Sequence, residues 1–241
     1  VKRLADGVYN YATGQPIQMP ELSPLTYGHT DARLILRVGG SMGDVYGQRL
    51  LKRDLNGYIL NEEGVGLAME NKETYLGSIL PKMNMGWSLG FGYKGVNLGM
   101  TFTGRFGGIV ISETQSVLDA AGVSKVSADV RDAGGVQINQ SKVSAQTYYQ
   151  TIQGTAAYYT YSATNVRLGE LSLSYTLPKK WFDNKVGMTV GLVGKNLWMI
   201  YCKAPYDPES TSSVTSNFYQ GVDYFQQPSL RSLGFNVKLT F

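Results

Sequence analysis

Apolar and polar residues alternate one by one along several stretches of the chain. The last stretch runs from Leu233 to Phe241, with apolar side chains at every second position and small or polar residues between them. Because successive side chains of a β-strand point to opposite faces of its sheet, this period of two predicts strands with one apolar and one polar face. Six stretches share the pattern, namely 32–38, 83–93, 96–103, 171–177, 186–192 and 233–241.

The spacing of these stretches favours a membrane barrel. A tilted strand of about 9–11 residues crosses the hydrocarbon layer, whereas strands of soluble sheets usually have about 5–6 residues. The predicted connections alternate in length, with short links at 94–95 and 178–185 and long ones at 39–82, 104–166 and 194–230. Short turns on one side and long loops on the other are typical of outer-membrane barrels.

The two faces of the predicted strands differ strongly. One face is mostly Gly, Ser, Thr and Asn, whereas the other carries bulky groups such as Trp87, Phe91 and Phe102. Aromatic residues near strand ends fit the girdles at the two membrane interfaces. These residues are Tyr93, Tyr175, Trp181, Trp198 and Tyr201. A soluble β-sandwich, which would bury its apolar face in a core, is the alternative source of the alternation.

Composition argues against several other classes of protein. The 241 residues include 29 glycines and 17 tyrosines, and the formal net charge is only +4. Richness in glycine and aromatic residues favours strands and turns over helices. The basic residues are scattered, so no nucleic-acid partner is expected. No apolar run reaches the ~18 residues that a membrane-spanning helix needs.

No arrangement of residues points to catalysis, a cofactor or a metal. The single cysteine, Cys202, and the single histidine, His29, cannot form a disulfide, a zinc site or an identifiable Ser–His pair. Residues 90–95 fit G-x-G-x-x-G, but a strand follows where a dinucleotide site requires a helix. Residues 54–57 (DLNG) and 207–209 (DPE) lack the spacing of a calcium loop and fit turns better. We therefore expect a protein that is not an enzyme.

Two of the long connections are rich in aromatic residues. Exposed aromatic side chains can stack on sugar rings or anchor a protein partner, whereas buried ones would pack the loops against each other. The candidate ligand or partner contacts are Tyr148, Tyr149, Tyr158, Tyr159, Tyr161, Tyr206, Tyr219, Tyr224 and Phe225. On the polar face, the candidate lumen-facing residues are Asn97, Thr101, Thr103, Arg105 and Glu170.

The order and spacing of several sequence blocks resemble the C-terminal part of SusC/RagA-type TonB-dependent transporters of Bacteroidetes. The resemblance extends from Leu34 to Phe241 and is thinnest at 112–160. The blocks that carry it are VGGSMGDVYG, LPKMNMGWSLGFGYKGVNLGMTFTGRFG, GELSLSYTLPKKWF, VGLVGKNLWMIY, APYDPES and QGVDYFQQPSLRSLGFNVKLTF.

The resemblance implies an all-β fold, in which residues 1–241 are the C-terminal strands of a large antiparallel transmembrane β-barrel, 22-stranded in the family. It implies long extracellular loops and short periplasmic turns, and a plug and earlier strands that are absent from this sequence. The implied partners are a SusD-like surface lipoprotein, the TonB complex acting through the absent N-terminal part, an oligosaccharide or peptide ligand, and outer-membrane lipid.

Import of oligosaccharides or peptides across the outer membrane of a Gram-negative cell is therefore the expected function. The alternative is a surface adhesin or structural outer-membrane barrel that binds a protein partner through its tyrosine-rich loops. A plug and a TonB box encoded upstream of Val1 would favour import, and a complete small barrel would favour the adhesin. A soluble β-sandwich binding module would stay in solution without detergent.

Overall fold

The structure is a computed structural model that describes residues 21–26, 30–62, 66–182, 186–210 and 221–240. It contains two compact units within residues 1–241, the range that the resemblance assigns to one part of a barrel. The first, called the strand unit, comprises Pro81–Gly107, Ser162–Ser210 and Gln227–Phe241. The second, called the mixed unit, comprises Val1–Leu80, Gly108–Tyr161 and Thr211–Gln226.

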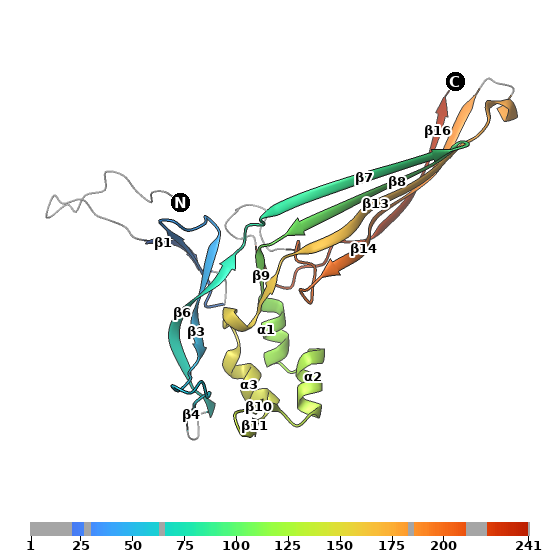
Figure 1. Cartoon of the computed structure of the whole chain (residues 1–241). Helices are drawn as coiled ribbons and strands as arrows, with labels where there is room; N and C mark the ends of the chain where they lie inside the picture. The colour runs from blue at the N-terminus through green and yellow to red at the C-terminus, as the bar shows by residue number, and fades with distance from the viewer. Residues whose placement is uncertain (1–20, 27–29, 63–65, 183–185, 211–220, 241) are drawn as a thin grey trace, which may run out of the picture. The chain divides into compact units, whose positions relative to one another are not determined.

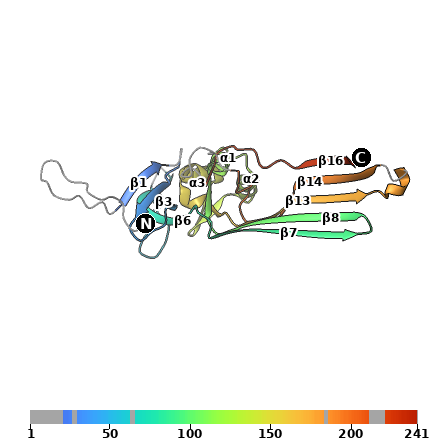
Figure 2. The same cartoon turned by 90° about the horizontal axis from the view of Figure 1, so that it is seen from above.

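The strand unit is built around one five-stranded antiparallel sheet with the order β16-β14-β13-β8-β7 (Figures 1 and 2). Its strands are β7 (Met83–Tyr93), β8 (Val96–Phe106), β13 (Asn165–Thr176), β14 (Gly187–Cys202) and β16 (Ser232–Thr240). Within this sheet each strand lies beside the previous and the next one along the chain, which is the arrangement of an up-and-down barrel wall. Five of the six alternating stretches therefore form the predicted continuous sheet.

The sixth alternating stretch, 32–38, is not a strand of this sheet, so its prediction as a strand of the same kind is wrong. It forms β2 (Arg33–Arg37), which lies in a sheet of the mixed unit. There Leu34 and its neighbour Ile35 are both buried. A strand that packs on a protein core and a strand that faces lipid can share the same period of two, so the pattern alone does not separate them.

Two barrel strands extend further than the alternation indicates. β13 has 12 residues and β14 has 16, so Trp198 and Tyr201 lie inside β14 rather than at the start of a loop. The pairing of β13 with its neighbours shifts between Leu168 and Glu170, and Asn196 in β14 has a positive φ of 51°. A β-bulge moves the following side chains to the opposite face, which hides a continuing strand from a search for strict alternation.

The predicted turn at Lys94 and Gly95 joins β7 to β8. Both residues have positive φ, 46° and 88°, which is the combination required by a type I′ hairpin turn. The turn also contacts the next strand, because the Thr176 amide donates a hydrogen bond to the Gly95 carbonyl at 2.7 Å. A Cβ atom on Gly95 would lie 2.9 Å from the Thr176 carbonyl oxygen, so this position suits glycine.

The mixed unit contains the remaining sheets. An antiparallel sheet has the order β1-β2-β3-β6, with β1 at Glu21–Thr26, β3 at Asp44–Leu51 and β6 at Met69–Ser78. A second sheet has the order β12-β9-β15, and β15 pairs in parallel with β9. Its strands are β9 (Ile109–Ser112), β12 (Thr160–Ser162) and β15 (Val222–Asp223). The two hairpins are β4 (Asn61–Glu62) with β5 (Gly66–Leu67), and β10 (Val136–Ile138) with β11 (Ser141–Val143).

Short helices complete the two units. The mixed unit holds α1 (Glu113–Ala120), α2 (Lys125–Asp132), α3 (Ala145–Ile152) and the 3₁₀ turn η1 (Ala156–Tyr158), and the strand unit holds η2 (Lys179–Phe182). Each α-helix begins after a serine whose side chain accepts a hydrogen bond from a first-turn amide, at Ser112, Ser124 and Ser144. None of the described helices is long and apolar enough to cross a membrane.

Two apolar clusters hold the mixed unit together. The first comprises Ala32, Leu34, Val45, Ile79, Ile111, Ala156 and Val222. The second comprises Leu51, Leu67, Ile138, Ala145, Tyr149, Ile152 and Tyr159. Much of the described part of the predicted long loops is therefore folded, with residues far apart in the chain meeting in shared cores.

The hairpin turn provides a test of the barrel fold. In the full-length protein, Gly95→Ala should destabilise the strand unit by about 1–2 kcal/mol, because an L-residue at this left-handed φ is strained. Lys94→Asn is the matched control and should be neutral, since asparagine tolerates the same region. Urea unfolding in lipid vesicles measures both, and equal stability of the two variants would contradict the turn assignment.

Candidate functional site

The register of the strand unit aligns alternating side chains into rows that cross all five strands. One row is Phe91, Leu98, Leu173, Leu192 and Phe235. The adjacent row is Gly92, Asn97, Ser174, Gly191 and Asn236. Because neighbouring positions of a strand point to opposite sides, the first row lies on an apolar face and the second on a polar face.

The apolar face is exposed in the structure. Phe91 is 59% exposed, Leu173 is 46% exposed and Phe235 is 79% exposed. Both apolar clusters of the described residues lie in the mixed unit. The strand unit therefore presents large apolar side chains without burying them in a core of its own, as a barrel wall that contacts lipid does. A soluble sandwich would instead bury this face.

The polar face carries the five candidate lumen residues. Across β8 and β13 the pairs are Asn97–Ser174, Thr101–Glu170, Thr103–Arg167 and Arg105–Asn165. Glycines keep this face thin, since a Cβ on Gly99 would lie 2.5 Å from the Ser172 hydroxyl oxygen. The structure thus brings the five candidates onto one face of small polar groups, and their exposure to a lumen stays a prediction.

A buried ion pair ties the connection after β14 to the sheet. Arg167 of β13 donates to both carboxylate oxygens of Asp207, with Nη2–Oδ1 at 2.8 Å and Nη1–Oδ2 at 3.4 Å. The two side chains are only 7% and 8% exposed. Ser229 also donates to Asp207 through its hydroxyl, at 2.6 Å. Asp207 therefore links the beginning of the connection, its end before β16, and β13.

The hydrogen bonds around Asp207 determine its ionisation. Burial alone would raise the pKa of this carboxyl group, but hydrogen bonds from Arg167, Ser229 and the Glu209 amide outweigh it and lower the pKa below its ordinary value. Asp207 therefore stays charged at neutral pH. The sequence does not predict this role, because residues 207–209 fit a simple turn. The one signal in the sequence for this ion pair is Arg167, an arginine on a strand face with few charges.

A pocket of about 310 Å³ adjoins this ion pair within the strand unit. Its lining includes Arg167, Asn196, Trp198, Tyr206, Asp207 and Arg231. Tyr206, a candidate contact from the sequence, is therefore placed beside charged and aromatic groups that could hold a polar ligand. Cys202 also lines the pocket, and its Sγ lies 3.5 Å from the Ala204 carbonyl oxygen.

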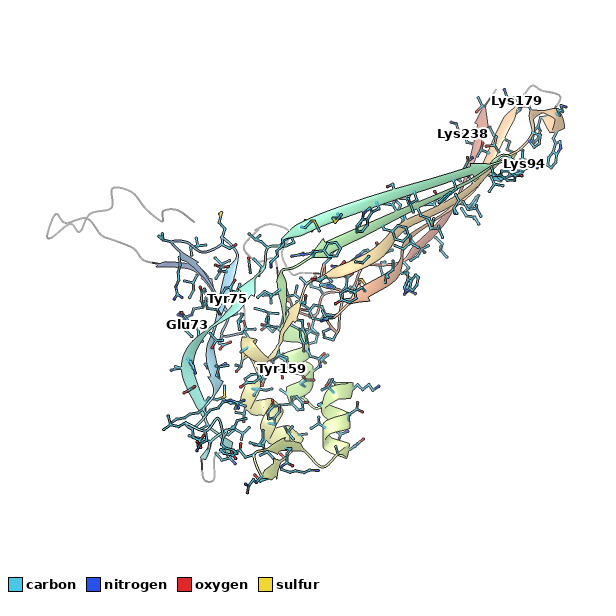
Figure 3. The ribbon with its side chains drawn as sticks, in the orientation of Figure 1. Glu73, Tyr75, Lys94, Tyr159, Lys179 and Lys238 are labelled. Carbon is cyan, nitrogen blue, oxygen red and sulfur yellow. The ribbon has the colours of Figure 1, made fainter. Side chains whose placement is uncertain are left out.

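The other candidate aromatic residues divide between packing and exposure. Tyr149 and Tyr159 are buried in the second apolar cluster, and Tyr148 and Tyr158 pack against it; Tyr159 is labelled in Figure 3. Burial raises the pKa of Tyr148 and Tyr161, and the latter is half-buried. These five residues thus belong to the interior of the mixed unit or its border.

Tyr224 and Phe225 are the exposed aromatic candidates, at 43% and 53%. Their rings meet edge to face with centroids 5.3 Å apart. Phe225 has a positive φ of 49°, which is unusual for a bulky residue, and its amide donates to the Thr114 hydroxyl at 2.6 Å. A strained, exposed aromatic pair is a candidate contact site. Tyr219 lies outside the described residues, as does His29.

The described residues contain no group of three or more His, Cys, Asp or Glu side chains that could hold a metal ion. Residues 54–57 form the predicted turn, in which Asp54 accepts hydrogen bonds from the amides of Asn56 and Tyr58 at 2.8 and 2.9 Å. This carboxylate is thus used for local structure.

Comparisons with known proteins agree with this architecture. TonB-dependent receptor P3 of Formosa agariphila is 26% identical over 171 residues, which are 68% of this chain and 17% of that receptor. The structure of the RagAB peptide transporter matches 92% of this chain and 24% of its own chain, with a TM-score of 0.61 and 20% identity. No family model matches the chain.

A second solved structure, the RagAB peptide importer in its open-open state, matches 92% of this chain with a TM-score of 0.55 and 19% identity. The chain spans 28% of that structure's chain, so it corresponds to a minor part of these proteins. The comparisons confirm the predicted all-β fold as part of an outer-membrane barrel. They also confirm the resemblance to SusC/RagA-type TonB-dependent transporters, which are not enzymes.

Removal of the charge at Asp207 tests the ion pair. In the full-length protein, Asp207→Asn should speed hydrogen exchange of the amides in 203–210 by about 100-fold, because losing one partner of a buried pair costs about 3 kcal/mol or more. Glu209→Gln is the matched control, since Glu209 is 42% exposed and contacts the same Arg167 at 3.3 Å. Its effect should be small. Equal exchange in both variants would contradict the anchoring role.

The stabilisation by the ion pair between Arg167 and Asp207 should depend on pH. A carboxyl group whose pKa is lowered on folding stabilises the fold above its unfolded pKa of about 3.9, and this stabilisation is lost as the pH falls through the lowered pKa. The protection of the amides in 203–210, measured as the ratio of intrinsic to observed exchange rates, should therefore fall in acid in the wild type, and Asp207→Asn should abolish that fall.

Proposed function

We propose that this chain, which has the fold of part of a SusC/RagA-type TonB-dependent transporter, forms barrel wall and extracellular connections of a protein that imports oligosaccharides or peptides. In this proposal it works in the outer membrane of a Gram-negative Bacteroidetes cell with a SusD-like surface lipoprotein. Energy from the TonB complex enters through other parts of the longer protein.

The observation that carries the proposal is the two-sided sheet. Leu173 and its row offer a bulky apolar surface for lipid, whereas Ser174 and its row offer small hydrogen-bonding groups. A wall of this kind separates lipid from an aqueous path, which is the requirement for a solute channel. The peptide import performed by RagAB supports peptides as one ligand class.

The mixed unit supplies the candidate capture surface. Its β15 is held by pairing with β9, and Val222 lies in the first apolar cluster. The neighbouring Tyr224 and Phe225 remain exposed. Aromatic groups presented by a rigid support lose little conformational freedom on binding, so they suit contact with a sugar, a peptide or the surface lipoprotein.

The aromatic pair also fits the second candidate function, a surface adhesin or structural barrel that binds a protein partner. The two functions differ in their energy requirement. Import ends when the TonB complex is deleted, whereas adhesion to a protein partner continues. Adhesion would also be unaffected by substitutions that change the polar face of the sheet.

The aromatic pair can be tested without disturbing the mixed-unit core. In the full-length transporter, the double variant Tyr224→Ser and Phe225→Ser should weaken lipoprotein co-purification or ligand capture by about tenfold or more, as expected for central aromatic contacts. Insertion into the outer membrane should be normal. The matched control is Tyr58→Ser, because Tyr58 is 48% exposed in the turn after Asp54.

Uptake of labelled oligosaccharides and peptides should be measured in the same strains, with and without the TonB complex. Import predicts TonB-dependent uptake that falls in the double variant and not in Tyr58→Ser. Normal co-purification and normal uptake in the double variant would refute the capture surface. Binding of a protein partner that is independent of the TonB complex, without any uptake, would favour the adhesin.

A further inference from the structure

The apolar face of the strand unit contains a groove of about 510 Å³. Its lining is almost wholly apolar, and the side chains come from β8, β13, β14 and β16. They include Val96, Leu173, Tyr175, Val190, Leu192 and Phe235. An apolar groove of this size accepts a hydrocarbon chain better than it accepts a polar solute.

One end of the groove lies at the hairpin turn between β7 and β8. Tyr175 pairs with Val96, which follows the turn directly, and a Cβ on Gly95 would lie 3.4 Å from the Tyr175 ring. The Lys94 ammonium lies 5.1 Å from the centre of the Tyr93 ring. Tyr93 belongs to the apolar face and pairs with Val96, a lining residue of the groove, so this cation–π contact holds the ammonium near that end of the groove.

The same end of the strand unit carries several lysines. Lys94, Lys179 and Lys238 gather there in Figure 3. The acidic residues among the described part of the strand unit are Glu170, Asp207 and Glu209. Asp207 and Glu209 contact Arg167, and Glu170 pairs with Lys195 in the sheet, away from the turn.

We propose that this groove and Lys94 bind a phospholipid with an anionic headgroup. The acyl chain would lie between Tyr175, Leu192 and Phe235, and the headgroup phosphate would meet the Lys94 ammonium. Lys179 would add positive potential at the same membrane surface. The inference rests on the proposed function, because it requires the apolar face to lie in a bilayer with the short turns at its periplasmic surface.

Charge complementarity favours a lipid over other occupants. A lysine near a membrane surface attracts anionic lipid with about 1 kcal/mol, and a long side chain can keep its stem in the apolar region while its ammonium stays at the headgroups. A second copy of this chain would bring another apolar face and more lysines, and no counter-charge. A phospholipid supplies an apolar chain and a phosphate in one molecule.

The occupant can be identified by crosslinking from inside the groove. The full-length transporter carries p-benzoylphenylalanine in place of Leu192, which lines the groove and is 62% exposed. It is reconstituted in nanodiscs with equal amounts of phosphatidylglycerol and phosphatidylcholine. After illumination, mass spectrometry gives the ratio of the two crosslinked lipids. Lys94→Gln and Lys82→Gln are then compared, because these lysines flank opposite ends of β7.

The proposal predicts more phosphatidylglycerol than phosphatidylcholine on the wild-type residue 192 probe. Lys94→Gln should lower that ratio about fivefold, the change that ~1 kcal/mol produces, while Lys82→Gln should leave it unaltered. Equal crosslinking of the two lipids, or an equal effect of both lysine variants, would overturn the lipid site and leave the transporter proposal standing. Crosslinks to a second protein chain would also overturn it. Absence of any lipid crosslink would contradict both proposals.

Discussion

Backbone hydrogen bonding between neighbouring strands is the interaction on which the strand unit depends. β8 and β13 pair with a strand on each side, as does β14 over 189–195, so most of their amide and carbonyl groups are satisfied without water. Only then can one face of the sheet meet hydrocarbon, where an unpaired backbone group costs several kcal/mol. The pleat of the strands places bulky and small side chains on opposite faces, so one face of a strand can contact lipid while the other contacts water.

The two units are stabilised by different means. The mixed unit buries leucine, isoleucine and valine in two clusters, as soluble proteins do. The strand unit has pairing, a hairpin turn and the ion pair between Arg167 and Asp207. That ion pair joins β13 to Asp207, which also accepts a hydrogen bond from Ser229. In the mixed unit, the pairing of β15 with β9 gives the aromatic pair Tyr224 and Phe225 a folded support.

The sequence predicts the sheet well, because the strict alternation in β7, β8 and β16 matches the side-chain period of a strand and not that of a helix. It is less informative where a bulge at Gly169 or Asn196 reverses the faces of a strand. It misplaces β2, since a buried strand shows the same period. The contacts of Asp207 and the burial of Tyr159 depend on residues distant in the chain. Composition and local pattern carry no information about such pairings, so the aromatic candidates could not be divided into packed and exposed ones beforehand.

The most direct measurement of the central claim is the environment of each residue along β8. A nitroxide label is placed in turn on Val96, Asn97, Leu98, Gly99 and Met100 of the full-length protein in lipid vesicles. The account predicts that collision with membrane-dissolved oxygen peaks at Val96, Leu98 and Met100, and that collision with a water-soluble nickel reagent peaks at the residues between them. A profile without this period of two, or with the peaks exchanged, would contradict the account.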